Sequence, residues 1–147
     1  MLLGVPVEYE LSVANVDKPR LTDGVIATRV KQFDGVAPVW LTEAPRFAQK
    51  AELFPGVCFV VGLDTAIRLL DARYSGGTDA RDAGLRRMLE LRCTVLVGGR
   101  IDAHGVFRTW GEQAGVLAEH AELFREIPTE LFRADISSTQ LRAVSGG

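Results

Sequence analysis

The stretch Val57-Cys58-Phe59-Val60-Val61-Gly62-Leu63-Asp64-Thr65 decides the fold class of this chain. Its first five residues are all apolar, and such a run is typical of a parallel strand that is covered on both faces. Gly62 ends the predicted strand, and Asp64 or Thr65 can cap the helix that follows. A second run of this kind, Cys93-Thr94-Val95-Leu96-Val97, ends at two glycines. Together the two runs indicate an α/β protein.

The rest of the chain alternates between strand-like and helix-like segments. Further strands are expected over residues 5–13, 36–41 and 106–110, and helices over 22–33, from 45 onward, 78–91 and 112–126. This order predicts one parallel sheet with helices on both faces. Right-handed crossovers then bring the carboxyl ends of the strands to one edge, where ligands bind in such folds. No internal repeat or linker divides residues 1–147, so a single domain is expected.

Composition narrows the class of protein. The chain has 147 residues with 47% hydrophobic and 24% charged side chains, which is ordinary for a soluble globular domain. A net charge of −2 argues against nucleic-acid and membrane-surface binding. The two cysteines lie in apolar runs without metal-ligand spacing, which predicts buried thiols in a reducing compartment. Without a signal peptide or a run of about 18 apolar residues, the expected location is the cytoplasm.

Three segments follow predicted strands and could contact a ligand. After the strand at 57–61, Gly62 allows a close backbone approach and Asp64 could bind a ribose or orient a metal-bound water, although Asp64 serves equally as a helix cap. After the first strand, Asn15 and Lys18 could contact a substrate, but a plain Asx turn is favoured there. After the strand at 93–97, Arg100 could reach a phosphate, although an arginine at this position is by itself a weak signal for a phosphate site.

The tail Asp135-Ile136-Ser137-Ser138-Thr139-Gln140-Leu141-Arg142 predicts a phosphate site. Free N–H groups at a helix N-terminus carry partial positive charge, and three hydroxyls can add donors. Arg142 follows Ser138 by four residues and Thr139 by three, so it shares their face. The alternative is a capping box formed by Ser137 and Gln140, which leaves three consecutive hydroxyls and the arginine unexplained.

The histidines and most arginines are expected to face solvent. His104 lies in a predicted turn and His120 on a predicted helix surface, and neither has a catalytic partner at the usual spacing. Residues 68–108 contain eight arginines and only five acids. This local excess of positive charge could bind phosphates, although a solvated helix face is favoured for most of the arginines.

In this order, the motifs resemble the nucleotidyltransferase superfamily of Rossmann-like adenylyl- and cytidylyltransferases. The resemblance covers essentially the whole chain and rests on Phe59-Val60-Val61-Gly62-x-Asp64-Thr65, Arg100 and Ile136-Ser137-Ser138-Thr139-x-x-Arg142. The chain is similar to nicotinamide and nicotinate mononucleotide adenylyltransferases, enzymes of NAD biosynthesis. Residues 10–19 and 50–56 resemble a cytidylyltransferase-like branch.

The resemblance implies an enzyme that transfers a nucleotidyl group from ATP or CTP to a phosphate-bearing, mononucleotide-like substrate, with release of pyrophosphate. Mg²⁺ usually assists such chemistry. The nucleoside triphosphate would be held by one set of residues, Gly62, Asp64, Thr65, Ser137, Ser138, Thr139 and Arg142, and the substrate by Asn15, Lys18 and Arg100. No protein nucleophile is needed, because positioning and charge neutralisation carry the reaction.

One part of the family pattern is absent from this sequence. The family begins with a strand and a glycine-rich turn that leads into a His-x-x-His motif, whereas this chain starts at Met1-Leu2-Leu3-Gly4. In the family's strand order 3-2-1-4-5 the absent strand is the central one, so two half-sheets with open inner edges are expected. The chain could be the C-terminal major part of a complete enzyme, could recruit a strand or self-associate, or could be a non-catalytic nucleotide-binding remnant or assembly module. The first account is favoured because the other site residues are present.

Replacing Arg142 tests the predicted phosphate site in the tail. Arg142→Ala should abolish most of the affinity for ATP or CTP, because a bidentate guanidinium contact to the phosphates is lost. Isothermal titration calorimetry measures this directly, and unchanged affinity would contradict the phosphate role.

Overall fold

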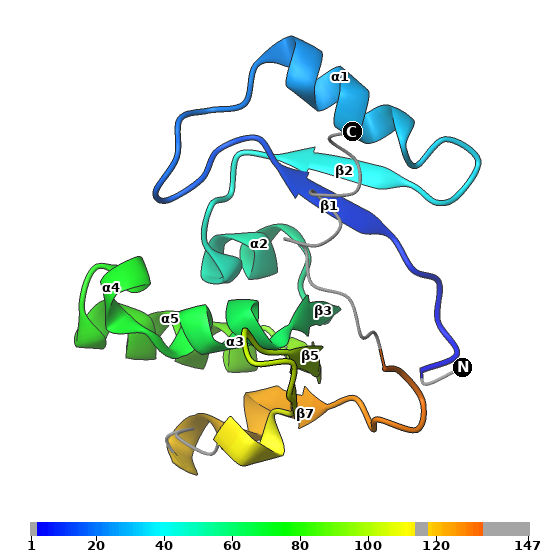
Figure 1. Ribbon diagram of the computed structural model, residues 1–147. Helices are drawn as coiled ribbons and strands as arrows, with labels where there is room; N and C mark the ends of the chain where they lie inside the picture. Colours follow the sequence, from blue (N-terminus) through cyan, green and yellow to red (C-terminus); the bar gives the residue numbers. More distant parts are fainter. Residues whose placement is uncertain (1–2, 114–117, 134–147) are drawn as a thin grey trace.

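The computed structural model describes residues 3–113 and 118–133, and these form two separate parallel sheets and a short hairpin (Figure 1). In the smaller sheet, β1 (Tyr9–Ser12) pairs with β2 (Val39–Thr42). The larger sheet has the order β3 (Cys58–Gly62), β4 (Thr94–Gly98) and β7 (Phe124–Glu126). The hairpin consists of β5 (Arg100–Ile101) and β6 (Phe107–Arg108). The prediction of an α/β protein with parallel strands is confirmed, while its Rossmann-like identity stays a prediction.

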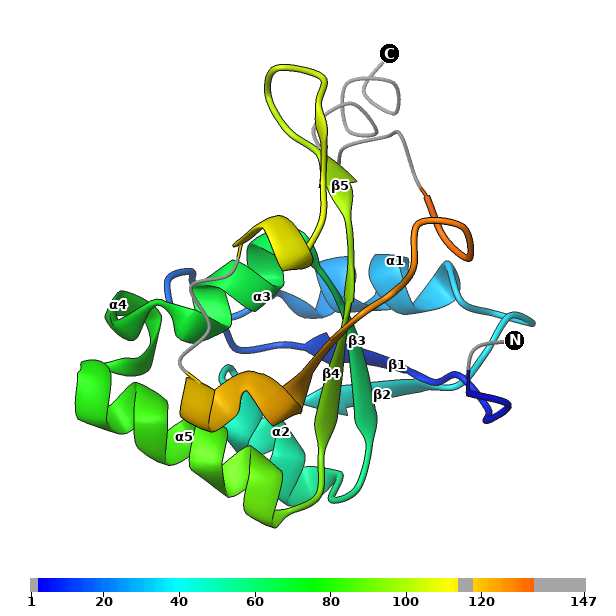
Figure 2. The same cartoon turned by 90° about the horizontal axis from the view of Figure 1, so that it is seen from below.

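The helices cover the two sheets differently. They are α1 (Asp23–Lys31), α2 (Phe47–Leu53), α3 (Leu63–Leu70), α4 (Ala72–Ser75), α5 (Thr78–Glu90) and the 3₁₀ helices η1 (Gly111–Gln113) and η2 (Ala118–Leu123). Helices α2, α3 and α5 lie together on one face of the larger sheet (Figure 2). Around the smaller sheet, Tyr9 contacts Phe33 after α1, and its neighbour Glu10 points the other way, to α2. The expected coverage of both faces therefore holds for β1–β2 only, within the described residues.

The hydrophobic core lies between the larger sheet and its helices. Val95 and Val97 of β4 are fully buried, and in register with them Phe59 and Val61 of β3 point to the same face. Met88 of α5 is also fully buried. Burying a side chain of this size contributes about 1.5–3 kcal/mol, so β4 and α5 dominate the stability of this unit.

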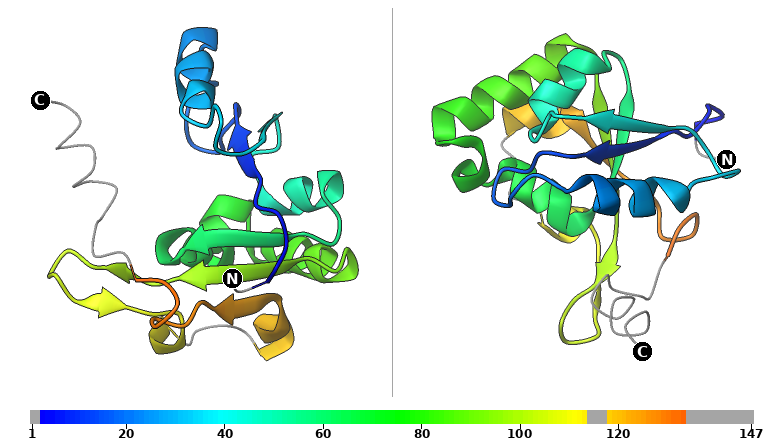
Figure 3. Two further views of the ribbon diagram at one scale, coloured as in Figure 1. Left: turned by 90° about the vertical axis from the view of Figure 1, so that its right-hand side faces the viewer. Right: turned by 90° about the horizontal axis from the view of Figure 1, so that it is seen from above.

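A buried ion pair connects the smaller sheet to the rest of the molecule. Strands β1 and β2 lie beyond β3 and run across its direction (Figures 1 and 3). Lys50 of α2 is only 7% exposed, and its ammonium pairs with Glu10, which also accepts a hydrogen bond from Thr42 of β2. The Trp40 ring adds an edge contact to Phe54, with the centroids 5.6 Å apart. The Lys50–Glu10 pair is therefore the main polar link between the smaller sheet and α2.

The structure corrects the prediction of a helix over residues 112–126. Residues 124–126 form β7, in which Phe124 pairs with Val95, and the Phe124 ring stacks on Trp110 at 4.8 Å. Pairing to a distant strand overrides the local helical pattern here. His120 is only 2% exposed and lies 3.7 Å from Asp82 of α5, so the prediction that it faces solvent was wrong.

The start of α3 also differs from the prediction. The helix begins at Leu63, with extended Gly62 as its N-cap, so neither Asp64 nor Thr65 caps it. Asp64 instead lies in the first turn, where a carboxylate interacts favourably with the helix dipole.

Other local expectations agree with the structure. His104 is exposed in the turn of the hairpin, and Gly105 has the positive φ of 77° that such a turn requires. Cys93 is buried and Cys58 half-buried, and both are free thiols. None of the helices in the described part of the chain has the length and apolar character needed to cross a membrane.

Replacing Lys50 tests the link between the sheets. Lys50→Met should lower the free energy of unfolding by about 2 kcal/mol, because it leaves the half-buried Glu10 carboxylate without its cation. The matched control is Arg20→Met, which removes the exposed Arg20–Glu43 pair of the same unit and should cost less than about 0.5 kcal/mol. Urea denaturation measures both values, and equal effects would contradict the assigned role of Lys50.

Candidate functional site

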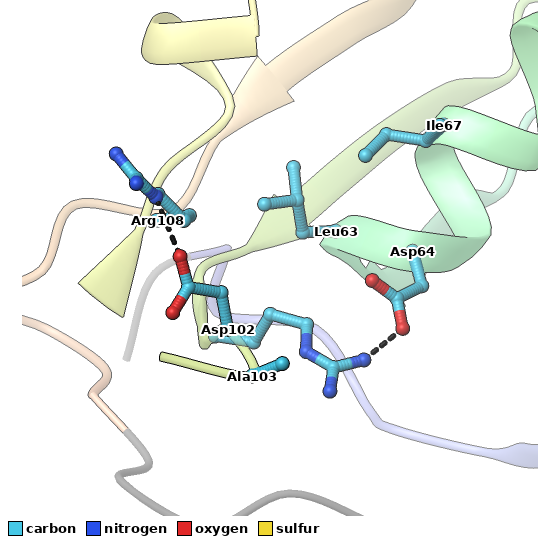
Figure 4. A pocket seen from close by; sticks show the side chains of 7 residues that line it. Leu63, Asp64, Ile67, Asp102, Ala103 and Arg108 are labelled. Carbon is cyan, nitrogen blue, oxygen red and sulfur yellow. Dashed lines mark hydrogen bonds and ion pairs between the residues drawn. The ribbon is translucent and has the colours of Figure 1, made fainter. Parts of the chain in front are cut away.

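A surface depression lies where the chain leaves the carboxyl ends of β3 and β4. Strand β3 passes directly into α3, and β4 passes through Gly99 into the β5–β6 hairpin. The depression has a volume of about 310 Å³, at the lower end of the range of ligand pockets. Its walls come from α3 and the hairpin, through Leu63, Asp64, Ile67, Arg100, Asp102, Ala103 and Arg108 (Figure 4).

The hairpin depends on Gly99 and Asp102. A Cβ atom at Gly99 would lie 2.7 Å from the carbonyl oxygen of Arg108, so no other residue fits at the bend after β4. The Asp102 carboxylate accepts hydrogen bonds from the backbone N–H groups of His104 at 2.8 Å and Val106 at 3.0 Å. Its second oxygen accepts from Arg108 Nε at 2.9 Å. Asp102 therefore fixes the turn and the Arg108 side chain together.

The hydrogen bonds to Asp102 also lower the pKa of its carboxyl group to about 2. The backbone N–H of Val106 contributes most, followed by the Arg108 guanidinium and then the backbone N–H of His104. Asp102 is consequently ionised at every physiological pH and acts as a fixed negative charge.

An ion pair joins α3 to the hairpin across the depression. Arg100 Nη1 donates to the Asp64 carboxylate, and Arg100 Nε donates to the carbonyl of Ile101 at 3.1 Å. The Asp64 side chain is 57% exposed and that of Arg100 is 33% exposed, so both are open to a ligand. Arg108 is the register partner of Arg100 in the hairpin, but its guanidinium pairs with Asp102 and not with Asp64.

The depression has a balanced charge and one apolar wall. Asp64 and Asp102 offset Arg100 and Arg108, while Leu63 and Ile67 line the side formed by α3 (Figure 4). A phosphate that binds here would have to replace Asp64 as the partner of Arg100, or bind together with a cation of its own. The apolar wall is suited to a flat or aliphatic group.

The structure brings together two residues that the sequence singled out separately. Asp64 and Arg100 are 36 positions apart and form the ion pair across the depression. Gly62 is exposed at the carboxyl end of β3, with nothing within 4 Å of the position of an added Cβ atom. Thr65 lies on α3 but does not line the depression.

Other predicted site residues do not line the depression between α3 and the hairpin. Asn15 and Lys18 are exposed in the loop after β1 and do not line the depression. Their prediction assumed one continuous sheet with a shared carboxyl edge, whereas β1 and β2 run across β3 (Figure 3). The tail residues Ser137, Ser138, Thr139 and Arg142 lie outside the described residues.

Sequence reasoning missed Asp102 and Arg108 as members of the site. Asp102 lies two residues before the turn at His104, and this spacing is a signal for an Asx turn. Arg108 belonged to the arginine-rich stretch that was interpreted as a solvated face. For Arg73 and Arg87 that interpretation fits, since their side chains are 85% and 46% exposed and pair with Asp71 and Glu52. The Arg81 side chain is only 16% exposed and pairs with Asp82, so the interpretation does not fit there.

The part of the chain that the structure describes contains no ready-made metal site. No group of three or more His, Cys, Asp or Glu side chains in residues 3–113 and 118–133 could hold an ion. A divalent cation at the depression would therefore depend on oxygen atoms from its ligand.

The sequence matches no family model, no curated protein and no solved structure. Function therefore has to be inferred from the geometry of the depression and from the sequence motifs.

Titration of Asp102 tests the geometry of the hairpin. Because its folded pKa is depressed, its contribution to stability is fully present above the ordinary value of 3.8 and is lost as the pH falls towards about 2. Carbon-13 NMR of the Asp102 carboxyl group should give a midpoint near 2, which moves upward in Arg108→Ala. Arg86→Ala, which changes an exposed arginine of α5 outside the depression, should leave the midpoint unchanged. A midpoint near 3.8 in the unmodified chain would contradict the assigned hydrogen bonds.

Proposed function

We propose that the depression between α3 and the hairpin binds a nucleoside triphosphate, ATP or CTP. We further propose that the chain is the major part of a nucleotidyltransferase domain. The observation that carries the proposal is the position of Arg100, opposite the N-terminal turn of α3 at the carboxyl ends of β3 and β4. Phosphates bind favourably where helix N-terminal N–H groups and a guanidinium converge.

The other lining residues suit further parts of a nucleotide. Ile67, which is 42% exposed, offers an apolar surface for a base, and the exposed Asp64 carboxylate can accept hydrogen bonds from ribose hydroxyls. Arg108, which is held by Asp102, provides a second guanidinium among the lining residues. By resemblance, Ser137, Ser138, Thr139 and Arg142 would add donors to the phosphates.

In the proposed reaction, a phosphate oxygen of a mononucleotide-like substrate attacks the α-phosphorus of the triphosphate. The new bond is a phosphoanhydride, the bond between the α- and β-phosphates breaks, and pyrophosphate leaves with the negative charge. Arg100 would neutralise phosphate charge once it exchanges Asp64 for the ligand. Mg²⁺ would arrive bound to the triphosphate, because the described residues offer no complete ligand set of their own.

A non-catalytic module is the second candidate function. Strand β3 is an edge strand among the described residues, and it has no charged residue or proline to protect this edge from association. A nucleotide-binding remnant of this kind would bind the triphosphate without turning it over.

Calorimetry with ATP and CTP tests the proposed binding site. Arg100→Ala should weaken binding by about tenfold to a hundredfold, the loss expected when a charge-assisted phosphate contact of about 1.5–3 kcal/mol is removed. Arg86→Ala, on α5 outside the depression, should bind as the unmodified chain does. Equal affinities in the two variants would contradict the proposal.

Pyrophosphate release distinguishes the two candidates. Release from ATP or CTP in the presence of a mononucleotide supports the transferase. Tight binding that depends on Arg100, without release, supports the non-catalytic module.

A further inference from the structure

The two arginines that line the depression are held by different kinds of partner. Arg108 Nε donates to Asp102 at 2.9 Å, and both residues belong to the β5–β6 hairpin. Arg100 lies in the hairpin as well, but its partner Asp64 lies in the first turn of α3. One ion pair therefore lies within the hairpin, and the other joins two separate elements.

The pair within the hairpin keeps a fixed negative charge in the depression. Asp102 also accepts the backbone N–H groups of His104 and Val106, and its side chain is only 24% exposed. The bond from Val106, followed by that from Arg108, lowers the pKa of this carboxyl group to about 2, so it stays ionised at physiological pH. Arg108 therefore meets a ligand with its own charge already offset.

The pair between the two elements is able to open. The Asp64 side chain is 57% exposed, and among the described residues it accepts a hydrogen bond from Arg100 only. Arg100 keeps its place when Asp64 leaves, because its Nε also donates to the carbonyl of Ile101 at 3.1 Å. The guanidinium is therefore the anchored partner of this pair, and the carboxylate is the partner that can turn into water.

A phosphate would meet the Asp64 carboxylate at the same guanidinium. Carboxylate and phosphate oxygens both bind the N–H groups of arginine, and the Asp64–Arg100 contact, which is dashed in Figure 4, lies on the lining of the depression. A phosphate that binds Arg100 therefore displaces Asp64, and the displaced carboxylate stays nearby on α3. Two negative groups then lie close together, which costs free energy unless a cation lies next to them.

We propose that Asp64 makes the depression select the Mg²⁺-bound form of a polyphosphate over the free anion, an inference that rests on the proposed binding of a triphosphate at Arg100. The two carboxylates and the two guanidinium groups of the lining cancel, so the depression has no general attraction for negative charge. The displaced Asp64 repels the free anion, whereas Mg²⁺ on the ligand removes two of its negative charges and attracts the carboxylate. Asp64 acts on the ion through its charge, since the described residues form no ligand set for a metal.

Binding of tripolyphosphate with and without Mg²⁺ tests the proposal. This probe has no ribose or base, so Asp64 meets only its phosphates. For the unmodified chain, isothermal titration calorimetry should give tighter binding in the presence of Mg²⁺. Asp64→Asn removes the charge at nearly constant size, and it should bind the free anion about threefold to tenfold more tightly while binding of the Mg²⁺-bound form changes little. The preference for the Mg²⁺-bound form then falls by the same factor.

Three further variants separate the charge of Asp64 from its place in the helix. Asp79→Asn removes an exposed carboxylate from the first turn of α5, outside the depression, and should leave the preference for Mg²⁺ unchanged. Asp64→Glu keeps the charge and should keep the preference. Asp64→Ser removes the charge through a different side chain and should behave as Asp64→Asn does, so the result does not depend on the folding of a single variant.

The outcomes separate this inference from the proposed function on which it rests. If tripolyphosphate binding weakens in Arg100→Ala but Asp64→Asn keeps the full preference for Mg²⁺, the phosphate site stands and the role of Asp64 is overturned. If tripolyphosphate binds equally well to Arg100→Ala, or not at all to the unmodified chain, the phosphate site at Arg100 is wrong and the inference fails with it. An equal gain for the free anion in Asp64→Asn and Asp79→Asn also overturns the role of Asp64, because the effect is then one of net charge.

Discussion

Strand β4 is the one described strand with hydrogen-bonded neighbours on both sides, and most of the molecule is organised around it. Its buried valines form the floor of the core on which α2, α3 and α5 pack. Its carboxyl end passes through Gly99, which no larger residue can replace, into the hairpin that holds Arg100 and Arg108. The same strand thus supports both the stability of the fold and the position of the candidate site.

Away from β4, order depends on fewer and more polar contacts. The smaller sheet shares no strand pairing with the larger one, and the Lys50–Glu10 pair is its main polar link to α2. Helix α1 buries none of its residues fully, so it adds little to that link. A buried ion pair stabilises a fold only weakly, because the cost of desolvating the two charges offsets much of their attraction. The β1–β2 unit is therefore held less firmly than the strands of the larger sheet.

The sequence predicted those features that depend on local pattern. The apolar runs at 57–61 and 93–97 form β3 and β4. Asp64 and Arg100 were expected at the same edge because the carboxyl ends of parallel strands share one edge of a sheet, and the two side chains do form an ion pair. Features decided by distant contacts were missed: β7 exists because Phe124 pairs with Val95, and His120 is buried against α5. Asn15 and Lys18 failed for a different reason, because the edge rule applies within one sheet and β1 belongs to another.

Gly62 connects the core to the candidate site, because it is both the last residue of β3 and the N-cap of α3, whose first turn carries Asp64. In the larger sheet Gly62 is the register partner of Gly98, the last residue of β4. The bend at Gly99 then leads from β4 to Arg100, which pairs with Asp64. A shift in the register of β3 and β4 would therefore separate the two members of the ion pair. The geometry of the depression thus depends on the pairing of two apolar strands, and the polar side chains that line it follow from that pairing.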